Sequence, residues 1–260
     1  MVSMRVSGLG KCAAVLVLAA APLWFSPATA ADDPPKETID INDRAAVEEL
    51  VRRYILEHPE VIIESVQRFE KRKQEAERAH QRAILASLRD DIENSPTSPV
   101  TGNPEGDVTV VEFFDYRCGY CKRVLPAIQE LLRTDSGVRY VFKEFPILGP
   151  DSVVAARAAV AAWKIDPEKY VAFHTDLMAS RGALSEQRVL DMAQRVGFAP
   201  DQLREAKKHP TVDAELQGNI ALGGRIGVRG TPAFIIGGRL VPGAIDLEQM
   251  RRLIAAARQS

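Results

Sequence analysis

The chain has 260 residues, with 34 basic and 35 acidic side chains and a formal net charge of −1. Proteins that bind nucleic acid along its phosphate backbone carry a clear basic excess, so this balance argues against a nucleic-acid partner. The length fits one large domain, or one domain of common size with an extension. The sequence favours the second arrangement, because a charged segment and an apolar segment meet at a turn-rich stretch over residues 95–106.

Residues 1–30 are predicted to be a cleavable signal peptide. A short start with two basic residues precedes an apolar run from Cys12 to Leu23, and Ala28-Thr29-Ala30 supplies the small residues that a signal peptidase needs. The apolar run is shorter than the ~20 residues that span a bilayer, which disfavours a retained anchor. Cys12 lies ahead of the apolar core, where a lipid-modified cysteine would not sit. We therefore expect a periplasmic protein.

Residues 31–95 are predicted to form a charged helical extension. Apolar residues recur at helical spacing from Asp43 to Glu57, and Pro59 ends this helix and suits the first turn of a second one. Helices this polar bury little in a monomer, so we expect the extension to join copies of the chain into a homo-oligomer. A flexible charged spacer is the alternative. The predicted apolar face consists of Val47, Leu50, Tyr54, Ile62, Val66 and Phe69.

Residues 96–260 are predicted to form an α/β domain in which helices cover a small mixed sheet. Val108–Phe114 is almost continuously apolar, which suits a central strand covered on both faces, and Gly237-Gly238 is typical of a hairpin turn. The expected order is strand, helix, strand, helical block, hairpin and helix. These elements cover residues 108–114, 119–133, 138–142, about 150–225, 233–236 with 239–241, and 247–256.

Cleavage after residue 30 would leave two of the three cysteines, Cys118 and Cys121, separated by Gly119 and Tyr120. A structural disulfide that closes so small a loop constrains the unfolded chain very little. A zinc site needs two further ligands, and the mature chain offers no third cysteine. We therefore favour a redox-active pair over both alternatives, and expect no metal and no cofactor. The histidines are scattered at His58, His80, His174 and His209.

The position of the cysteine pair gives its two members different roles. Cys118 is expected at the start of a helix, where backbone N–H groups and the helix dipole favour a thiolate. Cys121 lies one turn further on and is expected to face inward as the resolving thiol. Such a pair exchanges disulfides with thiols of other proteins through a mixed disulfide on Cys118.

The turn Gly230-Thr231-Pro232-Ala233 directly precedes a predicted buried strand. This turn is expected to face the cysteines across the end of the sheet. The backbone of Thr231 would then be free to pair with an extended substrate segment. Without the cysteine motif upstream, an ordinary turn proline would be the default interpretation.

Three stretches of the sequence together resemble the DsbA family of bacterial thiol-disulfide oxidoreductases. The charged extension makes the chain most similar to the ScsC/Com1-like branch, and the resemblance reaches from about residue 40 to the C-terminal end. It implies a thioredoxin fold interrupted by a helical domain, and a cis bond between Thr231 and Pro232. The stretches are Val110–Cys121, Phe142–Pro146 and Gly230–Phe234.

The residues between the cysteines depart from the strong oxidases of the family. Gly119-Tyr120 and the threonine before Pro232 resemble DsbC-type isomerases, whereas those oxidases carry proline-histidine and valine at these places. We therefore expect an enzyme that acts on exported proteins mainly as an isomerase or reductase, and a membrane redox partner that resets its cysteines. A DsbA-type oxidase is the first alternative, and a non-catalytic chaperone or binding protein is the second.

Glu112 is the remaining predicted site residue. It lies on the same side of its strand as Val110 and Phe114, so we expect a buried carboxyl with a raised pKa that relays the proton of Cys121. The family places an acid here, which strengthens this interpretation. A solvated carboxylate at a strand edge is the alternative, and Lys143 is a candidate charge partner for Glu112.

Overall fold

The computed structural model describes residues 40 and 42–259. The predicted signal peptide, with Cys12, lies outside the described residues. The chain divides into two units, Met1–Ile63 and Glu64–Ser260, which are described separately. No helix among the described residues is long and apolar enough to cross a membrane.

The first unit contains helix α1, Arg44–Glu57, and the start of α2, Glu60–Ser87. The side chain of Asp43 caps α1 by accepting hydrogen bonds from the backbone N–H groups of Ala45 and Ala46 at 3.0 and 3.4 Å. The helix buries none of its residues. Its large apolar side chains are therefore exposed to solvent, among them Leu50, Val51, Tyr54 and Leu56.

The second unit begins within α2 and continues into the short helix α3, Arg89–Glu93. The helical pattern is interrupted at Leu88, whose ψ of 14° lies outside the helical region. This break lets Leu85, Leu88 and Ile92 all pack against the sheet together with Val111. The end of α2 is thereby attached to the core of the second unit.

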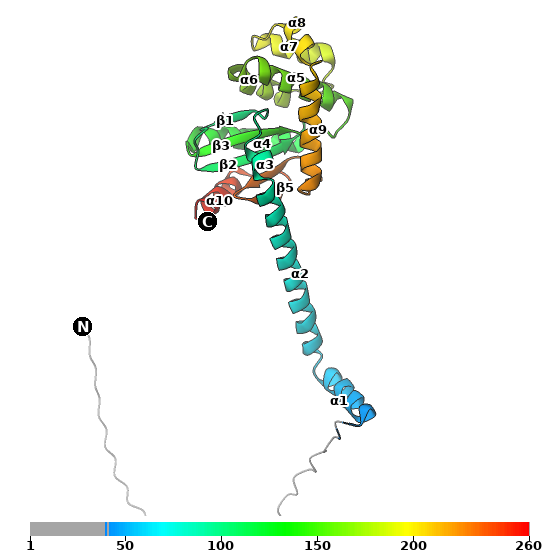
Figure 1. Ribbon diagram of the computed structural model, residues 1–260. Coiled ribbons are helices and arrows are strands. Elements are labelled where there is room, and N and C mark those ends of the chain that lie inside the picture. The colour runs from blue at the N-terminus through cyan, green and yellow to red at the C-terminus, as the bar shows by residue number, and fades with distance from the viewer. Residues whose placement is uncertain (1–39, 41, 260) are drawn as a thin grey trace, which may run out of the picture. The chain divides into compact units, whose positions relative to one another are not determined.

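The core of the second unit is a five-stranded mixed sheet of order β1-β3-β2-β4-β5 (Figure 1). Strands β2 and β3 are parallel, and the other neighbouring pairs are antiparallel. Almost every residue of the two central strands is buried, as expected for strands covered on both faces. The strands are β1 Val100–Gly102, β2 Val108–Phe114, β3 Val138–Glu144, β4 Ala233–Ile236 and β5 Arg239–Pro242.

Helices cover both faces of this sheet. On one face, Val110 and Tyr140 pack with residues of α4, Gly119–Thr134, and α10, Leu247–Arg258. The opposite face packs against α2, α3 and α9. Pro126 lies inside α4 without dividing it. This layered α/β arrangement confirms the predicted fold class.

Five helices lie between β3 and β4 in the chain, and Figure 1 shows α5 to α8 grouped together on one side of the sheet. Four of the five begin with a proline in their first turn, where the missing N–H costs nothing. The helices are α5 Pro150–Ile165, α6 Pro167–Ala179, α7 Glu186–Arg195, α8 Pro200–Ala206 and α9 Pro210–Arg225.

Candidate active site

The two cysteines lie where the central strand β2 gives way to α4. Cys118 is the N-cap of α4, with an extended backbone at φ −71° and ψ 114°, and its carbonyl accepts from the N–H of Lys122 at 3.1 Å. Its own N–H donates to the carbonyl of Asp115 at 3.0 Å. The sulfur of Cys118 therefore lies at the positive end of a helix, an environment that favours a negative charge.

Both cysteines are free thiols and both are largely covered by the surrounding chain. Cys118 is 5 % exposed and Cys121 is 1 % exposed, so Cys118 is the member of the pair nearer to solvent. Burial raises the pKa of the Cys121 thiol, and the nearby charge of Glu112 raises it further. Cys121 consequently keeps its proton at neutral pH unless a base removes it.

The loop with Pro232 is in contact with the first cysteine. The sulfur of Cys118 donates a hydrogen bond to the carbonyl oxygen of Thr231 at 3.1 Å. The peptide bond between Thr231 and Pro232 is cis, as the family resemblance implies. The contact follows from the register of β4, in which Ala233 lies opposite Phe113 near the end of β2.

The surface beside this contact is open. A groove of about 320 Å³ is lined by the Pro232 loop and by residues of the β4–β5 hairpin, including Leu240 and Pro242. Tyr120, between the cysteines, is 57 % exposed, and the guanidinium of Arg123 lies 4.7 Å from the centre of its ring. The site therefore offers an apolar groove and an exposed aromatic ring next to a reactive sulfur.

Glu112 lies in the core, on the face of the sheet against which Cys121 of α4 packs. One carboxyl oxygen accepts a hydrogen bond from the hydroxyl of Tyr140 at 2.8 Å, and the other, Oε1, has no hydrogen-bond partner. Burial raises the pKa of Glu112 to about 7, and the hydrogen bond from Tyr140 opposes this rise. Glu112 is therefore a buried carboxyl that titrates near neutral pH, not a solvated edge residue.

The expected pairing of Glu112 with Lys143 is wrong. Successive side chains of a strand point to opposite faces, and Lys143 shares its face with Val141, on the side away from Glu112. Its ammonium group donates to the carbonyl of Asp91 at 2.8 Å and to the hydroxyl of Ser98 at 2.9 Å. Burial lowers the pKa of Lys143 to about 8.

Asp115 organises the loop before the cysteines, a role that the sequence did not indicate. Its carboxylate accepts from the N–H of Arg117 and the hydroxyl of Ser152, both at 2.7 Å. It also accepts from the N–H groups of Ile147 and Leu148 at 2.9 and 3.0 Å. The segment after β3 is thus tied to the segment after β2. An acid directly after a buried strand was the only signal for this, because its partners are distant in sequence.

A second buried polar cluster joins the segment between β2 and α4, which leads to the cysteines, to α6. The hydroxyl of Tyr116 donates to Glu144 at 2.9 Å and lies 3.1 Å from the ring nitrogen Nδ1 of His174. The hydroxyl of Tyr170 also donates to Glu144, at 3.2 Å. Burial raises the pKa of Glu144 well above its usual value, which favours its neutral form, and lowers the pKa of His174 to about 3, so the imidazole is neutral at pH 7.

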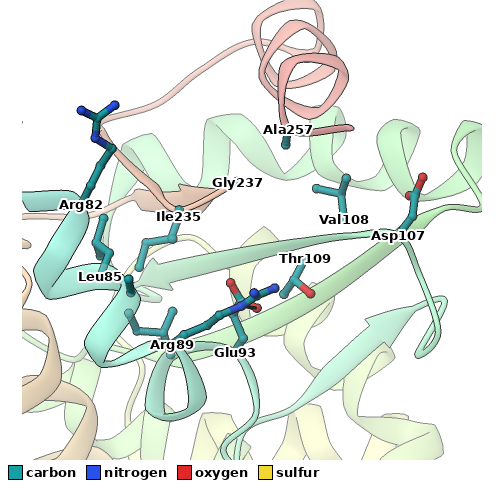
Figure 2. A pocket seen from close by; sticks show the side chains of 13 residues that line it. Arg82, Leu85, Arg89, Glu93, Asp107, Val108, Thr109, Ile235, Gly237 and Ala257 are labelled. Carbon is teal, nitrogen blue, oxygen red and sulfur yellow. Dashed lines mark hydrogen bonds and ion pairs between the residues drawn. The ribbon is translucent and has the colours of Figure 1, made fainter. Parts of the chain in front are cut away.

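Another cavity, of about 470 Å³, lies between α2, α3 and the β4–β5 turn, and none of the predicted site residues lines it (Figure 2). Its charged side chains include Arg89 and Glu93, which form an ion pair at 2.9 Å. Among residues 40 and 42–259, no group of three or more potential metal ligands is placed to hold a metal ion. The cysteine site is thus the place where the described reactive groups converge.

Two family models match the sequence. The DSBA-like thioredoxin domain matches residues 109–255, which contain the cysteine pair and the Pro232 loop. The copper resistance protein ScsC N-terminal domain matches residues 43–76, within the helical extension.

Solved structures and curated proteins agree with these matches. A thioredoxin-like oxidoreductase from Silicibacter pomeroyi is 45 % identical, with 66 % of this chain and 98 % of that one covered at a TM-score of 0.64. The catalytic domain of Proteus mirabilis ScsC is 30 % identical, with 69 % and 99 % covered at a TM-score of 0.64. Disulfide bond formation protein D of Bacillus subtilis is 26 % identical, with 60 % of this chain and 75 % of that protein covered.

The first curated relatives are much longer than the matched region. They are sodium/proton antiporters of Salinispora, and the match spans only 24 % of their length. Antiport therefore has no support in this similarity. Because the DSBA-like model matches more than half of the chain and two solved relatives, 45 % and 30 % identical, are covered almost completely, this chain belongs to the DSBA-like thioredoxin family.

Proposed function

We propose that this protein exchanges disulfides with exported proteins through Cys118 and Cys121, with Glu112 as the proton acceptor of Cys121. The observation that carries the proposal is the contact between the Cys118 sulfur and the carbonyl of Thr231 at 3.1 Å. The sulfur, already at the N-terminus of α4, thereby lies beside a backbone segment that can pair with an extended chain. In this proposal Thr231, Pro232, Gly119 and Tyr120 bind the substrate.

The proposed reaction runs through a mixed disulfide. The thiolate of Cys118 attacks one sulfur of a client disulfide, the client S–S bond breaks, and the second client sulfur leaves as a thiolate. Cys121 then loses its proton and attacks the sulfur of Cys118. This forms the bond between Cys118 and Cys121 and releases the first client sulfur as a thiolate. Two electrons pass from the protein to the client.

Glu112 supports the second step. The thiol of Cys121 is protonated at neutral pH because burial raises its pKa, so resolution requires a base inside the core. A carboxyl group with a pKa of about 7 and one unpartnered oxygen can accept this proton at neutral pH.

The direction of exchange is proposed to favour isomerisation and reduction. In isomerisation, a second client thiolate attacks the mixed disulfide before Cys121 does, and the protein leaves with its own pair reduced. Gly119-Tyr120 and Thr231 support this direction through their resemblance to DsbC-type isomerases. A dithiol oxidase is the alternative. It would be recovered from cells with Cys118 and Cys121 oxidised, whereas an isomerase would be recovered mainly reduced and would refold a scrambled substrate.

The periplasm is the proposed location. The predicted signal peptide and a relative from Salmonella enterica described as a periplasmic thioredoxin-like protein, 30 % identical, support it. In that compartment the clients are exported proteins with cysteines, and a membrane redox partner resets the cysteine pair.

The helical extension is proposed to join copies of the chain. Large apolar side chains on α1 and on the first half of α2 are exposed, including Tyr54, Ile62 and Phe69. Burial of such side chains between copies would stabilise an oligomer. Light scattering of the mature protein tests this, with Tyr54→Glu and Phe69→Glu expected to lower the mass. A monomeric mass for the unaltered protein would reject it.

The central test of the function is a trapping experiment. Cys121→Ala should accumulate a mixed disulfide between Cys118 and client proteins, because the resolving thiol is missing. Cys118→Ala is the matched control and should form no such adduct. The unaltered protein should also reduce insulin in the presence of a thiol. The function is rejected if Cys121→Ala forms no adduct and insulin remains oxidised.

A further inference from the structure

Four cationic side chains lie around the cysteine motif without a carboxylate partner among the described residues. The guanidinium of Arg117 donates to the carbonyl of Leu148 at 3.4 Å, and the ammonium of Lys122 donates to the carbonyl of Ser180. The guanidinium of Arg188 donates to the carbonyl of Ala183 at 3.4 Å. The fourth, Arg123, lies over the ring of Tyr120. We refer to Arg117, Lys122, Arg123 and Arg188 as the cationic rim.

Arg117 and Arg188 lie close enough to Lys122 to interact with it, and Lys122 lies close enough to Cys118 to do the same. The pKa of Lys122 is lowered mainly by burial and then by the charges of Arg188 and Arg117, and Cys118 acts on it in the opposite direction. Arg188 comes from α7 and Lys122 from α4, so the rim is assembled from two parts of the chain that are distant in sequence.

Nearby acids do not neutralise the rim. Asp115 is buried, and its carboxylate is occupied by bonds to Arg117 N–H, Ser152 and the 147–148 backbone. Asp151 accepts from the N–H of Leu184 at 3.1 Å. The rim therefore contributes more positive charge than these two acids balance.

Several other surface cations of the same domain are paired with acids. Arg133 and Arg252, for example, form ion pairs with glutamates three or four residues away on their own helices. Unpaired cations next to a reactive group are available for a partner, and their field accelerates the approach of a negatively charged one.

The rim borders apolar surface. Ile147 and Leu148 are 41 % and 44 % exposed, and the bonds from their N–H groups to Asp115 hold this segment beside the cysteine loop. Exposed apolar side chains provide contact area, and the surrounding cations select the charge of the segment that is bound.

We propose that the polypeptide segments presented to Cys118 carry acidic side chains beside their reactive cysteine. The inference rests on the proposed function and specifies the partner class of the same site. An acidic segment would place its carboxylates against the cationic rim while its cysteine lies at the sulfur of Cys118. A basic segment would meet like charges at the same positions.

Stopped-flow kinetics with three synthetic peptides tests the proposal. Each peptide has one cysteine capped as a disulfide with 2-mercaptoethanol, flanked by two glutamates, two serines or two lysines. At low ionic strength the reduced protein should react about tenfold faster with the glutamate peptide than with the lysine peptide. In about 0.5 M salt this ratio should fall to about two, because screening removes the contribution of exposed charges.

Two double variants assign the effect to the rim. Arg117→Gln with Arg188→Gln should lower the glutamate-to-lysine ratio at low salt to about three. Arg133→Gln with Arg252→Gln removes the same charge from distant sites and should keep the ratio of the unaltered protein. All four side chains are solvent-accessible, so no packed core group is lost. The ratio cancels any general change in the reactivity of Cys118.

The outcomes separate the two proposals. Equal rates for glutamate and lysine peptides, or a ratio that survives loss of Arg117 and Arg188, would overturn the preference for acidic partners while the serine peptide still reacts. If none of the three peptides reacts with the reduced protein, the proposed function itself fails.

Discussion

Two buried carboxyl groups on one face of the sheet have different surroundings. Glu112 on β2 and Glu144 on β3 each keep one oxygen without a hydrogen-bond partner, and burial raises the pKa of both. Glu112 has one tyrosine donor and lies near Cys121, whereas Glu144 has two tyrosine donors and no cysteine among the groups that shift its pKa. Burial is thus common to the two, and only Glu112 is placed to act on a reacting sulfur.

The comparison shows that a buried acid can have a structural role, as Glu144 has, or a chemical role, as we propose for Glu112. Glu144 links Tyr116, in the segment before the cysteine pair, to Tyr170 of α6, and burial favours its neutral form, so it acts as a fixed hydrogen-bond acceptor. Glu112 titrates near pH 7 and can exchange a proton under working conditions. The difference predicts that equivalent substitutions will affect rate and stability in different proportions.

The largest expected effect is on the rate of the resolving step. Glu112→Gln should slow formation of the bond between Cys118 and Cys121 by about 100-fold at pH 8, because general-base catalysis commonly contributes 10²–10⁴-fold. In the unaltered protein this rate should rise through pH 7 as the carboxylate forms, and the variant should lack that inflection. Single-turnover kinetics from pH 5 to 9 measures both. Identical profiles would remove Glu112 from the mechanism.

Both carboxyl groups should make stability depend on pH. The folded protein holds the proton of Glu112 up to about pH 7, whereas the unfolded chain releases it near pH 4.5. The stabilisation is therefore fully present below pH 4.5 and is lost as pH rises to about 7, by at most about 1.4 kcal/mol per pH unit for one proton. Denaturant unfolding of the reduced protein should show a shallower decline for Glu112→Gln. Parallel curves would contradict the assigned pKa.

Tyr140→Phe tests the difference between Glu112 and Glu144 by removing the one hydrogen bond to Glu112. The bond from Tyr140 lowers the pKa of Glu112, so its loss should move the inflection of the resolving rate to higher pH and slow the reaction a few-fold at pH 7. Tyr170→Phe, which loses the corresponding bond to Glu144, is the matched control and should leave the inflection in place. A shift of equal size in both variants would show that the effect is not specific to Glu112.

The smallest kinetic effect is expected at the second carboxyl. Glu144→Gln keeps an acceptor for the two tyrosines and should change the resolving rate by less than about twofold, while it flattens the decline of stability with pH as Glu112→Gln does. Circular dichroism checks the fold, and the kinetic assay is the one used for Glu112. A large loss of rate in a folded variant would mean that the two acids act as one relay.

Much of the fold could be predicted from the sequence, because in many segments the local conformational preference agrees with the packing of the folded chain. The apolar run of β2, the helix after the cysteines and the Gly237-Gly238 hairpin lie where they were expected. Strand β1, Val100–Gly102, was missed, since three residues in a turn-rich stretch carry no periodic pattern and become a strand only by pairing with β3. The break at Leu88 is a second feature that local periodicity does not show, and the residues around it pack against the sheet.

Those site residues that lie close together in the sequence could be predicted from it. The cysteine pair and the inward position of Glu112 follow from spacing and strand alternation. The partner of Glu112 did not follow, because choosing Tyr140 over Lys143 requires the face that each presents in the paired β3 strand. The bonds of Asp115 to Ile147 and Leu148 likewise join segments that meet only after the sheet has formed.

Gly119 lies between the buried Cys118 and the exposed Tyr120. A Cβ atom added at this position would meet no heavy atom within 4 Å. The position therefore has room for the first carbon of a side chain without repacking of its neighbours. Since these intervening residues influence how readily the cysteine pair gives up electrons, the oxidising strength of the protein is open to evolutionary adjustment while its scaffold stays constant.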